Sequence, residues 1–250
     1  MKKPKLCLKI LLAVLIVLPA VFFTVFGLAK AKKVFINKWF VNEKRSTIGV
    51  DLSSYQAKVD MNALKAQGIA FVYIKATEGS AYQDERFRDN WDHAPEAGLP
   101  SGAYHFFSFD SRGATQAENY IQTVGPELRG RLLPAVVVEY YGEKEANPPP
   151  REDVVRELTV LLEALEAQYG VKPMIYTRSE LYEKYLEGTF DAYPFWISSL
   201  YTPLRWNYRG DWYLWHYLNR GELAGYEGGE KYIDLDVLNR DKDLEMLTVK

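Results

Sequence analysis

The sequence has little cysteine and little histidine, and this scarcity excludes several kinds of site. Cys7 is the single cysteine, so no disulfide can form within the chain. The three histidines, His93, His105 and His216, lie far apart and show no metal-ligand spacing, so we expect no zinc site. Neither a glycine-rich phosphate-binding motif nor a serine or cysteine nucleophile motif is present.

Charge is missing from one long stretch near the N-terminus. The run from Ile10 to Ala29 contains 20 residues without a charge, which is long enough to cross a bilayer as a helix. It is longer than the core of a signal peptide, which has roughly 7 to 15 residues, and Ala29-Lys30-Ala31 is a poor cleavage site. We therefore predict a basic segment at 1–9 and a transmembrane signal anchor at 10–29. Secretion after signal cleavage is the alternative.

The charges are divided unevenly between the two parts of the chain. Residues 1–45 contain ten Lys or Arg and one acid, whereas the remainder contains 21 basic and 32 acidic residues, a net charge of −11. A nucleic-acid-binding domain is expected to present a basic face. The acidic balance of the main domain therefore argues against a nucleic-acid partner.

The rest of the chain divides into a linker and one domain. Residues 30–47 form a basic juxtamembrane linker whose Phe35, Trp39 and Phe40 suit the lipid interface. From residue 48 to 250, apolar strand patterns alternate with helical ones, as in an α/β domain. The expected strands are Ile48–Leu52, Ala70–Ala76, Ser101–Phe107, Leu133–Glu139, Met174–Thr177, Phe195–Ser198, Tyr213–Tyr217 and Tyr232–Leu235.

Eight strands is a number that closes a barrel, so we predict an irregular (β/α)8 TIM-like barrel. The clearest helix is Arg151–Tyr169, where apolar residues recur at spacings of three and four between Pro150 and Gly170. Little room for helices remains after Phe195, and this makes the barrel irregular. The other expected helices are Met61–Gln67, Asp84–Ala97 and Thr115–Val124.

Carboxylates stand at the expected strand ends, where a parallel barrel gathers its functional groups. Glu139 ends an apolar strand, so its surroundings should be partly dry and its pKa raised, as a general acid requires. Asp51 and Asp234 lie in the first and last strands, which are neighbours in a closed barrel. Asp236 competes with Asp234, because residues two apart on a strand face the same side.

Several motifs make the chain resemble one enzyme family. In their order and combination, they look like the strands of glycoside hydrolase family 25 lysozymes, over roughly residues 48–239. The motifs are Gly49–Gln56, Phe71–Gly79, Gly102–Phe107, Pro173–Thr177, Phe195–Ile197, Trp215–Tyr217 and Ile233–Leu235.

The resemblance implies hydrolysis of the β-1,4 bond between N-acetylmuramic acid and N-acetylglucosamine in peptidoglycan, without a metal or other cofactor. It implies that Glu139 is the proton donor and that Asp51 and Asp234 are the further catalytic carboxylates. The substrate-facing aromatic residues that it implies are Tyr104, Tyr176, Trp196 and Trp215.

Four further residues at the strand ends are candidates for substrate binding. Lys75 and Glu78 are two of them, although they could instead form a structural ion pair. His105 is another, with an ordinary hydrogen-bonded strand residue as the alternative, and Tyr217 is the last.

The chain departs from the family at one position beside the expected acid. The family usually has Asp-x-Glu at the end of the fourth strand, whereas this chain has Val137-Val138-Glu139. Residues 137 and 139 face the same way, so a carboxylate is missing next to Glu139. Loss of one such group can lower a rate by about 10² to 10³-fold. The alternative function is therefore a weakly active or inactive domain that binds cell-wall glycans.

These predictions together describe a single-pass protein of the cell membrane with its barrel outside the cytoplasm. The expected partners are peptidoglycan glycan strands and, through residues 10–29, the membrane. We expect a monomer.

Overall fold

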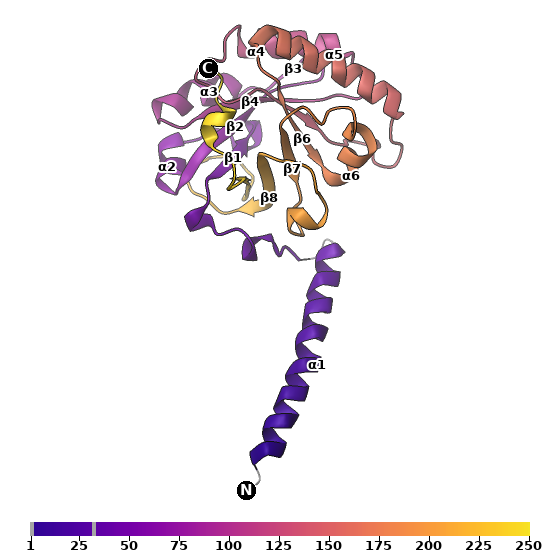
Figure 1. Ribbon diagram of the computed structural model, residues 1–250. Coiled ribbons are helices and arrows are strands. Elements are labelled where there is room, and N and C mark those ends of the chain that lie inside the picture. The colour runs from indigo at the N-terminus through magenta and orange to yellow at the C-terminus, as the bar shows by residue number, and fades with distance from the viewer. Residues whose placement is uncertain (1–2, 32–33) are drawn as a thin grey trace.

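A closed barrel forms the main domain, and a long helix projects from it (Figure 1). The computed structural model describes residues 3–31 and 34–250. Helix α1 (Lys3–Lys30) contains the predicted apolar run. Its segment Lys9–Ala29 has a mean hydropathy of 2.8 and projects away from the barrel except at its C-terminal end, so it is a candidate membrane span.

The barrel closes because β1 pairs with β2 on one side and with β9 on the other. All eight predicted strands are present, and a short ninth strand, β3, forms a hairpin on the edge of β2. The strands are β1 (Ile48–Leu52), β2 (Ile69–Glu78), β3 (Tyr82–Gln83), β4 (Ser101–Phe106), β5 (Ala135–Val138), β6 (Met174–Arg178), β7 (Phe195–Ser198), β8 (Leu214–Gly221) and β9 (Ile233–Leu238).

The last strand corrects the expectation of a fully parallel barrel. Strand β9 runs antiparallel to both β8 and β1, whereas the other neighbours in the barrel are parallel. The connection from β8 to β9 contains no helix, and a parallel crossover needs about a dozen residues or more, usually with a helix. The start of β9 therefore lies at the end of the barrel where the other strands finish, which we call the mouth.

Helices cover the outside of the barrel, most visibly α4 and α5 in Figure 1. Helix α5 spans the predicted residues because Pro150 precedes it, Gly170 ends it in a left-handed conformation, and one face is apolar and buried. Helix α3 begins later than expected because Asp84 accepts hydrogen bonds from the backbone of Ser54 and Arg86. The helices are α2 (Met61–Ala66), α3 (Phe87–Glu96), α4 (Gly113–Val124), α5 and α6 (Ser179–Leu181), with short turns η1 (Asn37–Trp39), η2 (Glu43–Arg45), η3 (Ser54–Gln56), η4 (Tyr182–Leu186), η5 (Leu204–Trp206) and η6 (Leu244–Leu247).

Residues 34–47, expected as a linker, pack against the outside of the barrel. Ile36 and Val41 are buried there. The buried amide of Asn37 donates hydrogen bonds to the backbone carbonyls of Ser199 and Tyr217. The folded unit therefore begins before residue 48.

Candidate active site

Three carboxylates and one imidazole meet at the mouth of the barrel. Asp51 on β1 and Asp234 on β9 are register partners in the pair of strands that closes the barrel. His216 on β8 joins them. One ring nitrogen of His216 and one carboxylate oxygen of each aspartate all lie within 4.8 Å of one another. Glu139 follows β5 directly and lies close enough to Asp234 and His216 for both groups to influence the pKa of its carboxyl. The three carboxylates that were predicted from the sequence therefore lie together at one end of the barrel.

Glu139 lies in surroundings that favour its protonated form. Its side chain is 28% exposed, and burial raises the pKa of this carboxyl above its ordinary value. The cations Arg178 and His216 oppose the shift; the Nε atom of Arg178 is 3.4 Å from Oε1 of Glu139. Because the net shift is still upward, Glu139 retains a proton to higher pH than a solvated glutamate. This is the property that a general acid needs.

His216 is the positive charge among these carboxylates. Burial lowers its pKa, but Asp234, Asp51 and Glu139 together more than offset this and raise the pKa to about 9. Its Nε2 atom is 3.7 Å from Oδ1 of Asp234. Its Nδ1 atom is 2.9 Å from the hydroxyl of Tyr176, which fixes the orientation of the ring. At neutral pH His216 is therefore an imidazolium held beside Asp234.

Below the mouth, the carboxyl group of partly buried Asp51 lies beside that of fully buried Asp236. Burial raises the pKa of both, and Asp234 adds to the shift of each. The indole N–H of Trp196 donates to Oδ1 of Asp236 at 2.9 Å. The Oδ2 atoms of Asp51 and Asp236 are buried and have no other hydrogen-bond donor among the described residues. Two adjacent carboxyl groups satisfy each other when they share one proton, and the raised pKa values favour that arrangement.

The predicted aromatic residues occupy different depths of the barrel. Tyr104 and Tyr176 lie on the inner face at the mouth, and nearby Asp51 contributes to a raised pKa for both hydroxyls after burial. Trp196 is only 1% exposed, and its ring packs against Tyr73 and Tyr176 with centroids 4.9 Å apart in each case. Its ring faces are therefore unavailable to a sugar, and Trp196 forms the floor of the site instead.

Lys75 and Glu78 bind each other at the rim of the mouth. Their side chains form an ion pair of 2.6 Å, which was the alternative considered from the sequence. The Lys75 ammonium also lies 5.2 Å from the ring centre of Tyr82 and 5.3 Å from that of Phe106. This ion pair orders one side of the rim and leaves Glu78 partly exposed.

Three predicted substrate residues point out of the barrel instead of into it. His105 is fully buried between Thr77 and Gln116, and both of its ring nitrogens are hydrogen-bonded. The side chain of Trp215 lies under the loop after β7 and donates to the carbonyl of Ser199. The side chain of Tyr217 lies under residues 34–47 and donates to Glu43. Because Tyr104 and His216 face inward, their neighbours at 105, 215 and 217 must face outward.

Sequence reasoning missed two members of the site and left a third undecided. Arg178 was not considered, although it stands two residues after inward-facing Tyr176 on β6. His216 is recognisable from the sequence as a residue near a strand end, but it was not assigned a role in the site. Asp236 was weighed against Asp234 as an alternative, whereas both face inward and each has its own partners. In all three cases, the alternation of side chains along a strand indicates that the residue faces the inside of the barrel.

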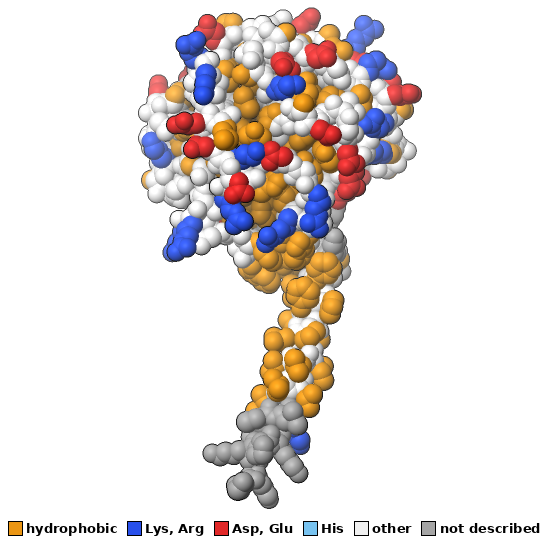
Figure 2. Space-filling model, in the orientation of Figure 1, with side chains coloured by type: hydrophobic (Ala, Val, Ile, Leu, Met, Phe, Trp, Pro, Cys, Tyr) orange, Lys and Arg blue, Asp and Glu red, His pale blue; other side chains and the backbone are white. Residues whose placement is uncertain are grey.

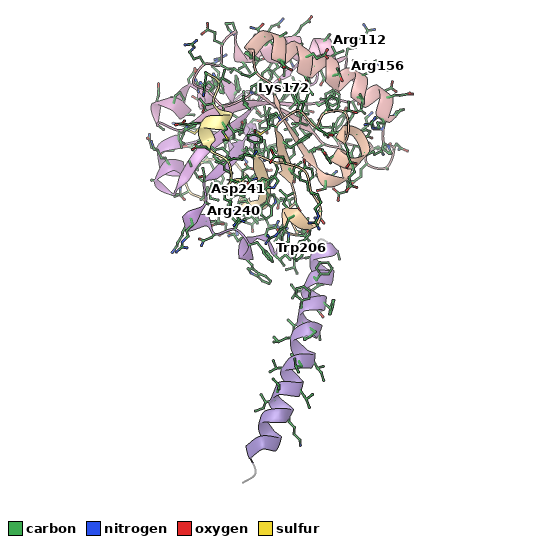
Figure 3. The ribbon with its side chains drawn as sticks, viewed as in Figure 1. Arg112, Arg156, Lys172, Trp206, Arg240 and Asp241 are labelled. Carbon is green, nitrogen blue, oxygen red and sulfur yellow. The ribbon has the colours of Figure 1, made fainter. Side chains whose placement is uncertain are left out.

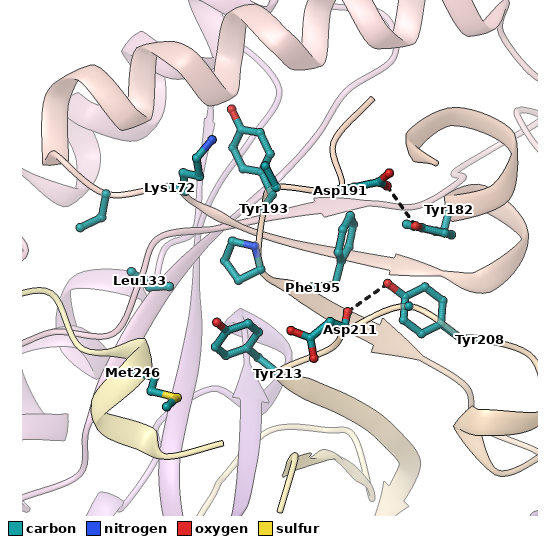
Figure 4. Close-up of a pocket in the computed structure, with 14 residues that line it drawn as sticks. Leu133, Lys172, Tyr182, Asp191, Tyr193, Phe195, Tyr208, Asp211, Tyr213 and Met246 are labelled. Carbon is teal, nitrogen blue, oxygen red and sulfur yellow. Dashed lines mark hydrogen bonds between the residues drawn. The ribbon is translucent and has the colours of Figure 1, made fainter. Parts of the chain in front are cut away.

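A separate cavity of about 590 Å³ lies away from the mouth (Figure 4). It is bounded by residues at or before the starts of β5 to β8, among them Leu133, Lys172, Tyr193 and Tyr213. Glu139, Asp51 and Asp234 are not among its lining residues. The presence of a large cavity therefore does not by itself mark the position of the catalytic carboxylates.

Comparison with known proteins agrees with this geometry. The family described as Glycosyl hydrolases family 25 matches residues 50–226. The uncharacterized protein YegX of Escherichia coli K12 is 32% identical over 197 residues, which cover 76% of this chain and 69% of that protein. Lysozyme M1 of Streptomyces globisporus is 29% identical over 194 residues, covering 72% and 64%. The structure of a family 25 glycosyl hydrolase from Bacillus anthracis is 44% identical, with a TM-score of 0.73 over 81% of this chain and 94% of that one. The chain therefore belongs to glycosyl hydrolases family 25.

Proposed function

We propose that this protein is a muramidase that hydrolyses the β-1,4 bond between N-acetylmuramic acid and N-acetylglucosamine in peptidoglycan. The observation that carries the proposal is the placement of Glu139 beside Asp234, His216 and Asp51 in a barrel of this family. Relatives named Lysozyme M1 and autolytic lysozyme support the substrate class. The comparisons give no support to the alternative, a glycan-binding domain without turnover.

Glu139 begins the reaction as the acid. Its protonated carboxyl donates the proton to the glycosidic oxygen, and the bond between that oxygen and the sugar carbon breaks. The partly dry surroundings of Glu139 keep the proton in place at the pH where the substrate binds. After the first sugar leaves, the Glu139 carboxylate can accept a proton from the attacking water, which restores the acid.

A second group must stabilise the positive charge that develops at the sugar carbon. Asp234 is one candidate, because it lies in the mouth and His216 holds it on one side. The carbonyl oxygen of the substrate's own acetamido group is the other candidate, and Asp234 would then orient that amide. In both routes the pair of Asp51 and Asp236 fixes the floor on which these groups stand.

Val137 removes one carboxylate from this arrangement. It is buried on β5, on the same side as Glu139, and it is paired in the sheet with Tyr176 and Phe106. An apolar neighbour keeps Glu139 dry, which favours the acid form. The missing charge nevertheless leaves less help for the developing cation, so we expect turnover below that of a site with Asp-x-Glu.

Helix α1 supplies the proposed location of the enzyme. The candidate span of 21 residues is about 30 Å long as a helix, which matches the thickness of the hydrocarbon core of a bilayer. We propose that α1 is retained as a single-pass anchor and that the barrel acts outside the cytoplasm as a monomer. Release after cleavage of α1 is the alternative, and the N-terminal mass of the mature protein distinguishes the two.

A dye-release assay on purified cell walls tests the activity. The full chain in detergent is compared with Glu139→Gln and with Glu163→Gln, a control on the exposed surface of α5. We expect wild type and Glu163→Gln to release dye and Glu139→Gln to lose nearly all activity. Equal activity in wild type and Glu139→Gln would overturn the assignment of the acid.

A further inference from the structure

Three large aromatic side chains are exposed where the barrel meets α1. Trp39 is 71% exposed, Phe40 47% and Trp206 37%. Figure 3 places Trp206 directly at the end of α1, and Figure 2 shows hydrophobic side chains gathered at this end of the domain. We call Trp39, Phe40 and Trp206 the aromatic platform. Exposure of this much aromatic surface is unfavourable in water and suits a membrane interface.

The aromatic platform is continuous with the apolar helix. The ring of Trp206 lies 5.5 Å from that of Phe26 on α1 and 5.7 Å from that of Phe40. Phe26 is among the last residues of the apolar run. A bilayer that surrounds α1 therefore reaches the aromatic platform at its polar surface, the depth at which Trp is enriched in membrane proteins.

Basic side chains surround the aromatic platform. They are the exposed residues Lys38, Lys44, Arg45, Arg205 and Arg240. Among the residues whose side chains the structure describes, none of these five has an acidic partner within 4.0 Å. Figure 2 shows Lys and Arg side chains beside the hydrophobic area at the base of the domain. Each basic residue near an anionic membrane contributes about 1 kcal/mol to binding.

A crevice of about 220 Å³ opens beside the aromatic platform. Phe40, Leu204 and Trp215 are among its apolar walls, and Arg205 and Arg240 are among the residues that line it. An apolar crevice with two guanidinium groups suits a lipid, because arginine binds phosphate and the walls accept part of an acyl chain. The crevice therefore adds a lipid-specific feature to the surface.

Residues 34–47 hold the aromatic platform rigidly on the barrel. Phe35 stacks on Tyr201 with ring centroids 4.6 Å apart, and Asn37 is hydrogen-bonded to the loop after β7. Tyr217 donates to Glu43 at 2.9 Å. This segment cannot act as a long flexible tether while these contacts are kept.

The end of α1 lies close to the mouth of the barrel. Buried Ala29 lines one depression together with Arg178 and Ser198, which stand at the ends of β6 and β7. Arg178 is the residue 3.4 Å from Glu139. A membrane around α1 is therefore close to the catalytic groups.

We propose that the aromatic platform and its basic surroundings dock the barrel on the surface of an anionic bilayer, so that the enzyme cleaves the glycan strands nearest the membrane. The inference rests on the proposed anchoring by α1. Docking is a claim beyond anchoring, because a barrel that is joined to its anchor by a flexible tether would not need to contact the lipid. The occupant of the surface is the phospholipid headgroup layer.

Fluorescence quenching in reconstituted bilayers tests the docking. The full chain is placed in nanodiscs that contain phosphatidylglycerol and lipids brominated near the glycerol end of the chain. We expect strong quenching of wild-type tryptophan fluorescence, and its loss in the double variant Trp39→Phe, Trp206→Phe. The control is Trp91→Phe, because Trp91 on α3 is buried in the barrel domain and the guanidinium of Arg131 covers its ring.

The charge requirement is tested in the same system. Arg205→Gln and Arg240→Gln should each shift the docked-to-undocked ratio about 5-fold towards the undocked state, whereas exposed Arg129→Gln should leave it unchanged. If the double tryptophan variant is quenched as strongly as wild type, or wild type is not quenched, the docking proposal is overturned. Carbonate extraction separates the two proposals: release of the protein contradicts the anchor, and retention without quenching contradicts the docking alone.

Discussion

Asp51 on β1 and Asp234 on β9 face each other across the antiparallel pair that closes the barrel. They are separated by most of the domain in sequence, and closure brings them to the same mouth. His216 binds on the Asp234 side, and Asp236 binds on the Asp51 side. The two aspartates consequently have different surroundings and different expected roles.

Replacement of Asp234 should slow catalysis without unfolding the barrel. We expect Asp234→Asn to lower kcat by about 10² to 10³-fold, because it removes a charge that stabilises the developing cation or orients the acetamido group. Asp234 is also the largest cause that raises the pKa of His216, so that pKa should fall from about 9. Wall hydrolysis and NMR titration of His216 check both parts. Asp89→Asn on α3 is the control, and an unchanged kcat would contradict the role.

The pH profile should report Glu139 as the acid. Burial raises the pKa of Glu139 and Arg178 lowers it, so Arg178→Gln should raise it further. Activity falls as pH rises through the pKa of an essential acid, and the alkaline limb of kcat/KM should therefore move to higher pH in this variant. The profile on soluble glycan fragments measures the shift, with Arg129→Gln as the control. Movement of the limb to lower pH would argue against Glu139 as the acid.

Restoring the missing carboxylate should raise the rate. We expect Val137→Asp to increase kcat, by up to about 10²-fold, because it places a negative charge on the inner face beside Glu139. The variant Val137→Asn has nearly the same shape without the charge and should show no gain. Dye release from purified walls compares the two. No increase in Val137→Asp would mean that Val137 does not limit turnover in this site.

The pair of Asp51 and Asp236 should make stability depend on pH. Burial raises both pKa values in the folded state, whereas an unfolded Asp ionises near its ordinary value of 3.8. The unfolded state therefore releases these protons first, and stability should fall as pH rises from about 4 through the raised folded values.

Asp236→Asn tests this linkage. An Asn can accept from Trp196 and donate to Asp51, so the variant should fold and lose less stability between pH 4 and pH 7 than wild type. Asp236→Ala leaves the partners unsatisfied and should be less stable by about 1–3 kcal/mol. Denaturant unfolding of the barrel, followed by fluorescence in detergent at each pH, makes the comparison. An equal pH dependence in wild type and Asp236→Asn would exclude the shared proton.

Local sequence patterns were enough to predict most of the helices and strands of this fold. Hydrophobic periodicity predicted the eight barrel strands and helix α5. It could do so because the barrel buries faces of the strands and one face of the helix, and the buried apolar residues therefore recur at regular spacings along the chain. The apolar run of α1 follows from composition alone. The strand-end rule also placed Glu139 and Asp51 at the mouth.

The tertiary structure decided what each side chain faces. Alternation tells which residues share a side, but not which side is the inside; thus His105, Trp215 and Tyr217 proved to face outward. The direction of β9 depended on a connection without a helix, and this direction brought Asp234 to the mouth.

The sequence by itself determined the family, the order of the strands and the three carboxylates, because these depend on residue type and on spacing along the chain. Only the closed barrel decided that Arg178 stands beside Glu139, that Asp236 pairs with Asp51, and that Trp206 joins Phe40 beside α1. Each of these pairs joins residues that are distant in sequence. Their contact depends on the register, direction and facing of strands across the whole sheet, which no local pattern encodes.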